Sequence, residues 1–182
     1  MSDSQLAYPF SRTWWITPGR VLGGGYPGST KPDEVDPRLR GLLDVGVTQV
    51  ICLQEANELG HDKQPFADYY PRLAALAAER GTSVFWARFP VRDVTAPPDE
   101  TMRAVLARLH AHPGVTYVHC WGGHGRTATV AGCWLREAGL SADEALTHIR
   151  AARAHDDYLV GQRAPQAPDQ HDIIRRWAAA PR

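Results

Sequence analysis

A nine-residue segment limits what this chain can fold into more than any other feature. Residues 119–127 read His-Cys-Trp-Gly-Gly-His-Gly-Arg-Thr, so a cysteine and an arginine enclose five residues, three of them glycine. The alternating pattern of residues 115–118 predicts a β-strand before this segment, and the residues from Thr127 onward predict an α-helix. The sequence therefore predicts a glycine-rich loop that joins the end of a strand to the N-terminus of a helix.

The residue types in this loop fit the binding of a phosphate group against a nucleophilic sulfur, that of Cys120. A thiolate is the attacking form, and backbone N–H groups at a helix N-terminus favour a negative charge. Gly122, Gly123 and Gly125 allow positive φ angles, so the backbone can curl and turn its donors inward. We expect these donors to bind phosphate oxygens, and the planar guanidinium of Arg126 to add a two-pronged contact.

The remaining residues of the segment have predicted supporting roles. The hydroxyl of Thr127, in the first turn of the helix, can donate a hydrogen bond to the thiolate. His119 directly precedes the cysteine, and we expect it to orient the loop rather than act as a base, because a thiolate needs none. The side chains of the curled loop should form the walls of the pocket mouth. The predicted binding residues are Trp121, Gly122, Gly123, His124, Gly125 and Arg126.

These residues resemble the signature loop of a known family, the cysteine-dependent protein tyrosine phosphatases. The similarity is greatest to the compact dual-specificity branch, and residues 118–123 most resemble its bacterial members and the cyclin-dependent-kinase-inhibitor-type phosphatases. Weaker matches at residues 24–28 and 163–170 extend the resemblance over nearly the whole chain. It implies a protein tyrosine phosphatase-like fold and a cysteinyl-phosphate intermediate. His124 is a departure, because this position is often apolar in relatives.

The same resemblance implies a general acid on a separate loop. In the family an aspartic acid follows an earlier strand, and here Asp93 ends the run Phe-Pro-Val-Arg-Asp after the strand-like residues 83–88. Asp93 is therefore the acid that we predict to protonate the leaving group. A solvated carboxylate or a helix cap is the alternative role for this residue. Other acidic residues that could lie near the site are Asp99, Glu100, Asp156 and Asp157.

Two further residues have open alternatives. Cys52, at the end of an expected buried strand, is a small core residue by default. Because some relatives place a second cysteine near the nucleophile, a reversible Cys52–Cys120 disulfide is the alternative. Gln170 either caps the last expected helix or orients a hydrolytic water, as glutamines do in some relatives. The segment from Asn57 to Tyr70 resembles nothing that would place it in the fold.

The predicted reaction is hydrolysis of phosphate monoesters, with phosphotyrosine in proteins as the first substrate and phosphoserine or phosphothreonine as further ones. It requires no metal and no cofactor, because the loop amides and Arg126 neutralise the phosphate charge. One alternative is a phosphate-binding module without activity, against which the intact Cys120, Asp93 and Arg126 argue. The other is hydrolysis of phosphoinositides or small metabolites, although the loop lacks lysines that would meet additional phosphates.

Composition argues against several other classes of protein. The chain has 182 residues, of which 43% are hydrophobic, enough for one packed domain. Its 20 basic and 20 acidic residues leave no net charge, which argues against nucleic acid or an anionic membrane as a partner. No apolar run approaches the roughly 20 residues that span a bilayer, and the first residues lack the pattern of a signal peptide. Three scattered cysteines favour a reducing compartment, so we expect a cytoplasmic location.

Alternating strand and helix patterns predict an α/β fold. We expect a single domain over residues 1–182, with a central, largely parallel sheet that is antiparallel at one edge and flanked by helices, and a loose segment at residues 1–11. The expected strands lie at residues 12–16, 20–22, 47–53, 83–88 and 115–118. The expected helices lie at residues 36–44, 71–78, 99–111, 127–138, 141–153 and 168–177.

Overall fold

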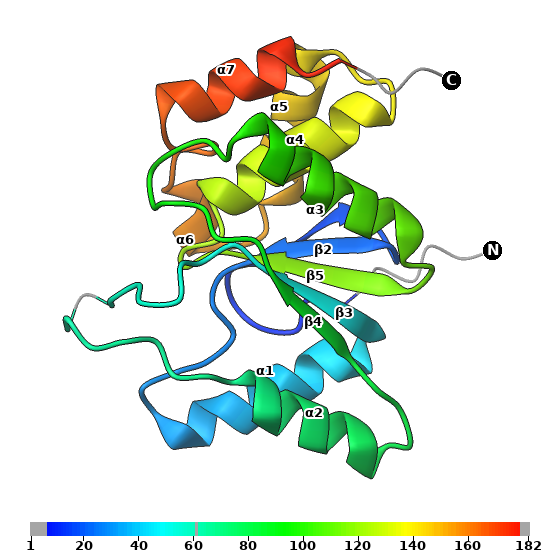
Figure 1. Ribbon diagram of the computed structural model, residues 1–182, viewed down its shortest axis with the longest axis vertical. Helices are drawn as coiled ribbons and strands as arrows, with labels where there is room; N and C mark the ends of the chain where they lie inside the picture. The colour runs from blue at the N-terminus through cyan, green and yellow to red at the C-terminus, as the bar shows by residue number, and fades with distance from the viewer. Residues whose placement is uncertain (1–6, 61, 179–182) are drawn as a thin grey trace.

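The computed structural model of the protein describes residues 7–60 and 62–178. Its centre is a sheet in the order β1-β2-β5-β3-β4, in which β1 pairs antiparallel with β2 and the other neighbours are parallel. The strands are β1 (Thr13–Thr17), β2 (Val21–Gly24), β3 (Val47–Cys52), β4 (Phe85–Arg88) and β5 (Val115–His119). The prediction of a largely parallel sheet with one antiparallel edge is confirmed (Figure 1).

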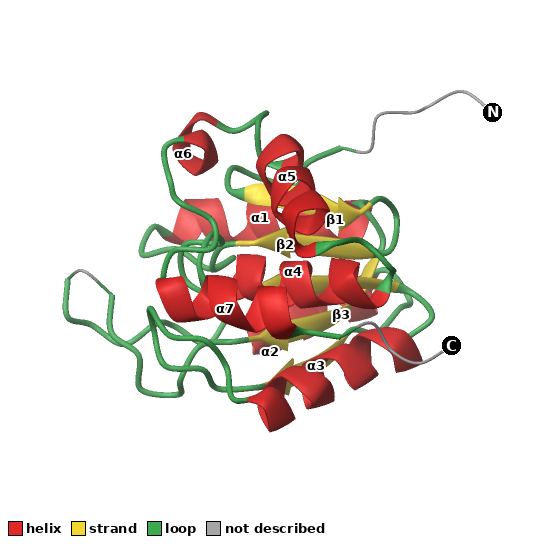
Figure 2. Ribbon diagram, turned by 90° about the horizontal axis from the view of Figure 1, so that it is seen from above, coloured by secondary structure: helices red, strands yellow, loops and turns green. Residues whose placement is uncertain are grey.

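Helices cover both faces of this sheet. The helices are α1 (Pro32–Asp44), α2 (Tyr70–Glu79), α3 (Asp99–Ala111), α4 (Arg126–Glu137), α5 (Ala142–Ala152), α6 (Asp157–Val160) and α7 (Pro168–Arg176). Helices α1 and α2 lie on one face, and α3, α4, α5 and α7 lie on the other (Figures 1 and 2). Each face has a hydrophobic core, one containing Leu39 and Leu73, the other Val130 and Ile174. None of the helices in the described residues is long and apolar enough to cross a membrane.

Local sequence signals explain where several helices begin and end. Pro32 lies in the first turn of α1, where its missing N–H leaves no helical bond unmade, and α1 therefore starts earlier than predicted. Ser141 and Glu144 form a reciprocal capping box at the start of α5, as predicted. Gly139, with a φ of +98°, ends α4. The short helix α6 lies outside the predicted helices, and the side chain of Asp156 caps its N-terminus.

The prediction of a loose segment at residues 1–11 is wrong for residues 7–11, the part of it that the structure describes. Residues 1–6 lie outside the described residues, but the five that follow pack against the domain. The ring of Tyr8 stacks on that of His155 with 3.4 Å between the centroids. The hydroxyl of Ser11 donates a hydrogen bond to Asp156 Oδ2 at 2.9 Å. These contacts hold the chain directly before β1 next to the start of α6.

The loops that follow the parallel strands meet at one edge of the sheet. The last residue of β5, His119, is in register with Gly24 at the end of β2 and with Cys52 at the end of β3. Ligands of open α/β sheets bind outside the carboxyl ends of the strands. This edge therefore brings the segment after β5 together with the loops after β2, β3 and β4.

Candidate active site

The loop after β5, residues 120–126 and hereafter the cysteine loop, surrounds the predicted nucleophile. Only 3% of the surface of Cys120 is exposed. Its Sγ accepts a hydrogen bond from the backbone N–H of Gly123 at 3.3 Å. The hydroxyl of Thr127 lies 3.1 Å from this sulfur and 3.1 Å from the carbonyl oxygen of Gly24, so two acceptors share its proton. The structure thus brings the predicted Thr127 donor to the sulfur, and these donors suit a negatively charged group.

Glycines allow the cysteine loop to lie directly on the end of β2. Gly123 has a φ of +80°, and a Cβ at this position would be 2.6 Å from the backbone of Gly24. A Cβ on Gly24 would in turn collide with the hydroxyl of Tyr117. On Gly25 it would lie 2.9 Å from the carbonyl oxygen of Trp121. The glycine run after β2 is therefore a surface against which the cysteine loop packs, and this close approach needs glycine on both sides.

His119 lies beneath the cysteine loop and is fully buried. Its Nδ1 is 3.0 Å from the carbonyl oxygen of Cys120, and its Nε2 forms a hydrogen bond with the hydroxyl of Tyr69. Burial lowers the pKa of His119 to about 4, so the ring is neutral at pH 7. A neutral ring that is bonded at both nitrogens fits the predicted role of orienting the loop, which stays a prediction.

Arg126, the first residue of α4, is also buried, with 1% of its surface exposed. Glu58 holds its guanidinium in a two-pronged ion pair, in which Nη1 donates to Oε2 at 2.6 Å and Nη2 to Oε1 at 2.8 Å. Burial alone would lower the pKa of Arg126, but the hydrogen bonds to Glu58 and the nearby Cys120 raise it above its usual value. The Nε–H is buried without a partner among the described residues, and a phosphate oxygen would satisfy it.

Glu58 is a functional candidate that is absent from the predicted site residues. It lies in the connection between β3 and α2, in the segment that the sequence could not place in the fold. Among the described residues of this connection, Leu59 and Pro65 form an isolated β-bridge. A carboxylate 68 residues before its partner has no local sequence signal, because only the tertiary fold brings the two together. Its contact with Arg126 fixes the plane of the guanidinium beside the cysteine loop.

Asp93 lies on the loop after β4, residues 89–98 and hereafter the acid loop, and faces the cysteine loop. Its Oδ1 is 2.8 Å from Nη2 of Arg126, and 43% of its side chain is exposed. The predicted acid and the predicted phosphate-binding cation thus meet in the structure. A partly exposed carboxyl group at this place can exchange its proton with a leaving group or with water.

Helix α7 anchors the acid loop from outside. Asp169 Oδ2 accepts a hydrogen bond from the backbone N–H of Ala96 at 2.7 Å. Gln170 Nε2 donates to the carbonyl oxygen of Thr95 at 3.0 Å, and its Oε1 accepts from the backbone N–H of Ala167, also at 3.0 Å. Gln170 therefore caps α7, the first of its two predicted roles. Its amide group is occupied by the backbone and does not line the cavity above Cys120.

The other acidic residues that could have competed with Asp93 have different partners or positions. Asp99 forms an ion pair with Arg176 at 2.5 Å. Asp156 caps α6 by accepting a hydrogen bond from the backbone of that helix. Neither of them, nor Glu100 or Asp157, lines the cavity above Cys120. Asp93 is the carboxyl group whose position fits proton transfer.

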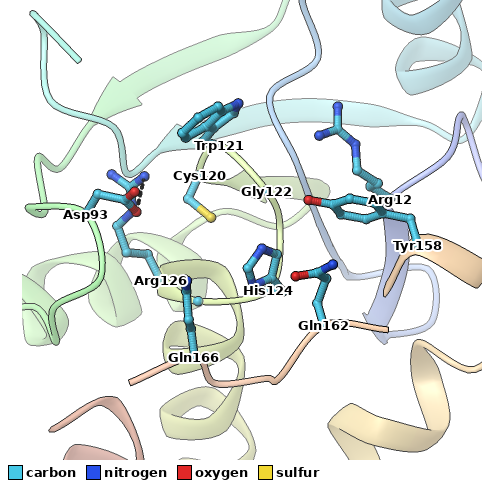
Figure 3. Close-up of a pocket in the computed structure, with 11 residues that line it drawn as sticks. Arg12, Asp93, Cys120, Trp121, Gly122, His124, Arg126, Tyr158, Gln162 and Gln166 are labelled. Carbon is cyan, nitrogen blue, oxygen red and sulfur yellow. Dashed lines mark ion pairs between the residues drawn. The ribbon is translucent and has the colours of Figure 1, made fainter. Parts of the chain in front are cut away.

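A cavity of about 410 Å³ opens above Cys120 (Figure 3). It is lined by Arg12, Asp93, Cys120, Trp121, Gly122, His124, Gly125, Arg126, Tyr158, Gln162 and Gln166. The predicted binding residues are among these, except Gly123, whose N–H points at the sulfur. Burial lowers the pKa of His124, so its ring is neutral at pH 7. Four residues, hereafter the rim, are absent from the predicted site: Arg12, Tyr158, Gln162 and Gln166.

Cys52 is buried at the end of β3, in register with His119. Burial raises the pKa of its thiol, and all three cysteines of the chain are free. The reversible disulfide with Cys120 stays a prediction. Within residues 7–60 and 62–178, no group of three or more His, Cys, Asp and Glu side chains is arranged to hold a metal ion.

The sheet is mixed, and a buried cysteine lies after β5 in a glycine-rich loop that leads into the N-terminus of α4. These features place the protein in a known class. It is a cysteine-dependent phosphatase of the dual-specificity type, as the resemblance implied. More specifically, the chain belongs to the PTP-SAK family, described as "Swiss Army Knife protein, DSP-PTPase phosphatase domain", whose model matches residues 10–166.

Solved structures of similar shape support the same fold. Tk-PTP in its active form has a TM-score of 0.64 and 24% sequence identity, over 91% of this chain and 95% of its own. The kinase associated phosphatase KAP has a TM-score of 0.66 and 18% identity, over 93% and 94%. PTPMT1 in complex with PI(5)P has a TM-score of 0.65 and 19% identity, over 91% and 94%. The predicted protein tyrosine phosphatase-like fold is confirmed.

Proposed function

We propose that the protein hydrolyses phosphate monoesters in two steps through a cysteinyl-phosphate. One observation carries the proposal. The buried sulfur of Cys120, the guanidinium of Arg126 and the carboxyl group of Asp93 line the same cavity, the last two 2.8 Å apart. A nucleophile, a fixed cation and a proton donor around one cavity are the groups that transfer of a phosphoryl group to sulfur requires.

In the first step the thiolate of Cys120 attacks phosphorus on the side opposite the leaving oxygen. The S–P bond forms as the P–O bond breaks, and the protonated Asp93 gives its proton to the departing oxygen. Loop N–H groups and Arg126 bind the other three oxygens. We expect the phosphate to replace Asp93 as the partner of Arg126 Nη2, so that the carboxyl group can face the leaving group.

In the second step the ionised Asp93 takes a proton from water, whose oxygen attacks phosphorus. The P–S bond breaks, inorganic phosphate is released, and Cys120 returns to the thiolate. The hydroxyl of Thr127, 3.1 Å from the sulfur, can stabilise the negative charge on the departing thiolate. Asp93 is protonated again and ready for the next cycle.

The reaction alone does not identify which class of phosphate monoester is the substrate. Phosphotyrosine in proteins, the substrate that the resemblance implies, stays a prediction. The similar structures carry names that point to different substrates, since one is a kinase associated phosphatase and another is in complex with PI(5)P. A phosphate-binding module without activity is disfavoured, because the three reacting groups are all present in one cavity. We also propose a cytoplasmic location, which the three free cysteines support.

Turnover of p-nitrophenyl phosphate by the purified protein tests the reaction. We expect hydrolysis by the wild type and a loss of at least about 10⁴-fold in Cys120→Ser, as for other enzymes that lose their nucleophile. Inorganic phosphate should still bind Cys120→Ser in a calorimeter, because the loop amides and Arg126 remain.

Cys133→Ser is the matched control, since this residue of α4 is buried in the core and does not line the cavity. It should hydrolyse the substrate at close to the wild-type rate. Phosphate binding without turnover by the wild type would support the inactive module instead. Undiminished turnover by Cys120→Ser would remove this cysteine from the mechanism.

A further inference from the structure

Arg12 brings a second cation to the cavity from a distant part of the chain. It directly precedes β1, and it lines the cavity above Cys120 although it is not part of the cysteine loop. Figure 3 shows Arg12 and Tyr158 on one side of Cys120, and Asp93 with Arg126 on the other. The cavity therefore has a positively charged side chain on each side of the nucleophile.

The backbone of Arg12 is held in an unusual conformation. Its φ is +67°, in the left-handed region that residues other than glycine seldom adopt. Two hydrogen bonds fix it there: its N–H donates to Asp156 Oδ2 at 2.7 Å, and its carbonyl oxygen accepts from the N–H of Gly25 at 3.1 Å. Gly25 is also the residue that packs against the cysteine loop. The side chain of Arg12 thus starts from a point that is fixed relative to the loop, as strained positions at functional sites often are.

The guanidinium of Arg12 differs from that of Arg126 in its partners. Arg126 is neutralised by Glu58 and Asp93, whereas Arg12 has no ion pair with a carboxylate in the described part of the chain. It lies instead over the ring of Tyr158, 5.5 Å from the centroid. The carboxylate of Asp156 is taken up by backbone N–H groups and the hydroxyl of Ser11. Arg12 therefore keeps its charge for a ligand in the cavity.

The other rim residues suit a polar ligand. The amides of Gln162 and Gln166 and the hydroxyl of Tyr158 can each donate and accept hydrogen bonds, as hydroxyl groups of a polyol require. A volume of about 410 Å³ lies in the range of small-molecule sites. The guanidinium of Arg12 lies over the ring of Tyr158, so the charge of Arg12 is held on the same side of the cavity as Tyr158 and Gln162 (Figure 3).

From these observations we propose that the preferred substrate is a small polyol bisphosphate, with one phosphate over Cys120 and the second bound by Arg12. The inference rests on the proposed hydrolysis and adds its substrate class. The cysteine loop lacks lysines for additional phosphates, and Arg12 supplies the missing positive charge from outside the loop. The polyol bisphosphate can be free or the headgroup of a lipid, and the two share the chemistry that Arg12 would recognise.

Competing substrates distinguish this specificity from general phosphatase activity. The wild type is assayed for kcat/KM on three small substrates: a myo-inositol bisphosphate, myo-inositol monophosphate and p-nitrophenyl phosphate. It is also assayed on a phosphotyrosine peptide with acidic neighbours, and the same measurements are made on Arg12→Gln and Arg12→Lys. Both variants keep a Cβ, so the backbone strain at this position is unchanged. Arg175→Gln is the matched control, because this exposed arginine on α7 pairs with Asp172 and does not line the cavity.

We expect the wild type to prefer the bisphosphate over the monophosphate, and Arg12→Gln to lose about 10- to 100-fold in kcat/KM on the bisphosphate alone, the value of a charged hydrogen bond. Arg12→Lys should retain part of the preference and Arg175→Gln all of it. The same assay is made on a short-chain lipid with this headgroup. If the lipid is turned over faster than the free bisphosphate, and the rate depends on Arg12 to the same extent, the lipid headgroup is the natural form of the substrate.

Three results would overturn the assignment, and none coincides with failure of the proposed function. The first is turnover of p-nitrophenyl phosphate without a preference for the bisphosphate. The second is an equal loss on all three substrates in Arg12→Gln. The third is dependence on Arg12 only for a phosphotyrosine peptide with acidic neighbours, which would assign the residue to a protein substrate. Absence of turnover of p-nitrophenyl phosphate would instead contradict the hydrolytic function itself.

Discussion

The cysteine loop and the groups around it are built in different ways. The loop is seven consecutive residues that pack against Gly24 at the end of β2 and contact the buried ring of His119. The groups that face it come from separate segments: Asp93 from the acid loop, Glu58 from the connection between β3 and α2, and the rim residues. The cysteine loop, hereafter the inner region, is a local sequence motif. The groups that face it, hereafter the outer region, come together only in the folded protein.

The two regions also have different proposed roles: the cysteine loop attacks and binds the phosphate, and the groups that face it transfer protons and select the substrate. The predicted nucleophile and phosphate-binding donors lie in a loop that tolerates little variation, because a Cβ on Gly123 would meet the backbone of Gly24. In our proposal, proton transfer, the orientation of Arg126 and the choice of substrate depend on side chains from separate loops and from α6, outside the cysteine loop. Loops on a rigid support are where binding and catalytic residues commonly lie.

Removal of the acid is the strongest test of the outer region. In Asp93→Asn we expect kcat on an alkyl phosphate to fall by about 10²- to 10⁴-fold, because the leaving oxygen has no proton donor. On p-nitrophenyl phosphate, whose leaving group needs little protonation, the loss in the first step should be much smaller. Values of kcat/KM on both substrates check this, because they report the steps up to the cysteinyl-phosphate and not its hydrolysis. Equal rates of wild type and variant on the alkyl ester would assign the acid elsewhere.

A methyl group in the cysteine loop tests the inner region. Gly123→Ala should lower the free energy of unfolding by about 2–4 kcal/mol, from the positive φ and from the contact with Gly24. Turnover should fall as the loop is displaced. Gly139→Ala is the matched control: its φ of +98° is equally unusual, but a Cβ there meets nothing within 4 Å. It should lose only about 1–2 kcal/mol and keep its activity. Denaturant titrations measure the free energy of unfolding of both variants. Equal losses in Gly123→Ala and Gly139→Ala would contradict the packing argument.

Glu58 tests whether the outer region also positions the inner one. In Glu58→Gln we expect kcat/KM to fall by about 100-fold, because Arg126 loses its charged partner and its fixed plane. The KM should rise with the fall in kcat, since Arg126 binds both substrate and transition state. Glu55→Gln changes the charge in the same loop on an exposed side chain and should behave as the wild type. If kcat and KM of Glu58→Gln equal those of the wild type, this ion pair has no part in positioning Arg126 for catalysis.

His119 gives the smallest expected effect, seen as a dependence of stability on pH. Burial lowers its pKa to about 4 from 6.5, so between these pH values the unfolded chain binds more protons than the folded one. Stability due to this group is therefore complete above pH 6.5 and falls as the pH is lowered, by about 2 kcal/mol at pH 5. His119→Gln should lack this part of the loss. Unfolding curves of both proteins from pH 7 to 5 check it, and parallel curves would contradict the burial argument.

The sequence was sufficient for the inner region for a physical reason. Cys120, Arg126 and Thr127 are neighbours along the chain, so their spacing and the glycines between them define the geometry. The strands and helices around them follow from hydrophobic periodicity and from caps such as Ser141 with Glu144. Asp93 was identified only through the resemblance to a family, since nothing local marks it as the acid.

The rest was beyond sequence reasoning because it depends on tertiary contacts. Glu58 lies 68 residues before Arg126, and its loop has almost no regular structure. Arg12 directly follows the segment predicted to be loose, and its hydrogen bonds to Asp156 and Gly25 hold it beside the cavity. The short helix α6, which carries Tyr158 close to Arg12, has four residues and no periodic pattern.

A direct search for the covalent intermediate tests the central claim. The enzyme is mixed rapidly with radiolabelled p-nitrophenyl phosphate, quenched during the first turnover and digested to peptides. We expect one labelled peptide, the one that contains Cys120, with the label absent from Cys120→Ser. Label on a different residue, or a burst of p-nitrophenol with no phosphate bound to the protein, would contradict transfer of the phosphoryl group to this sulfur.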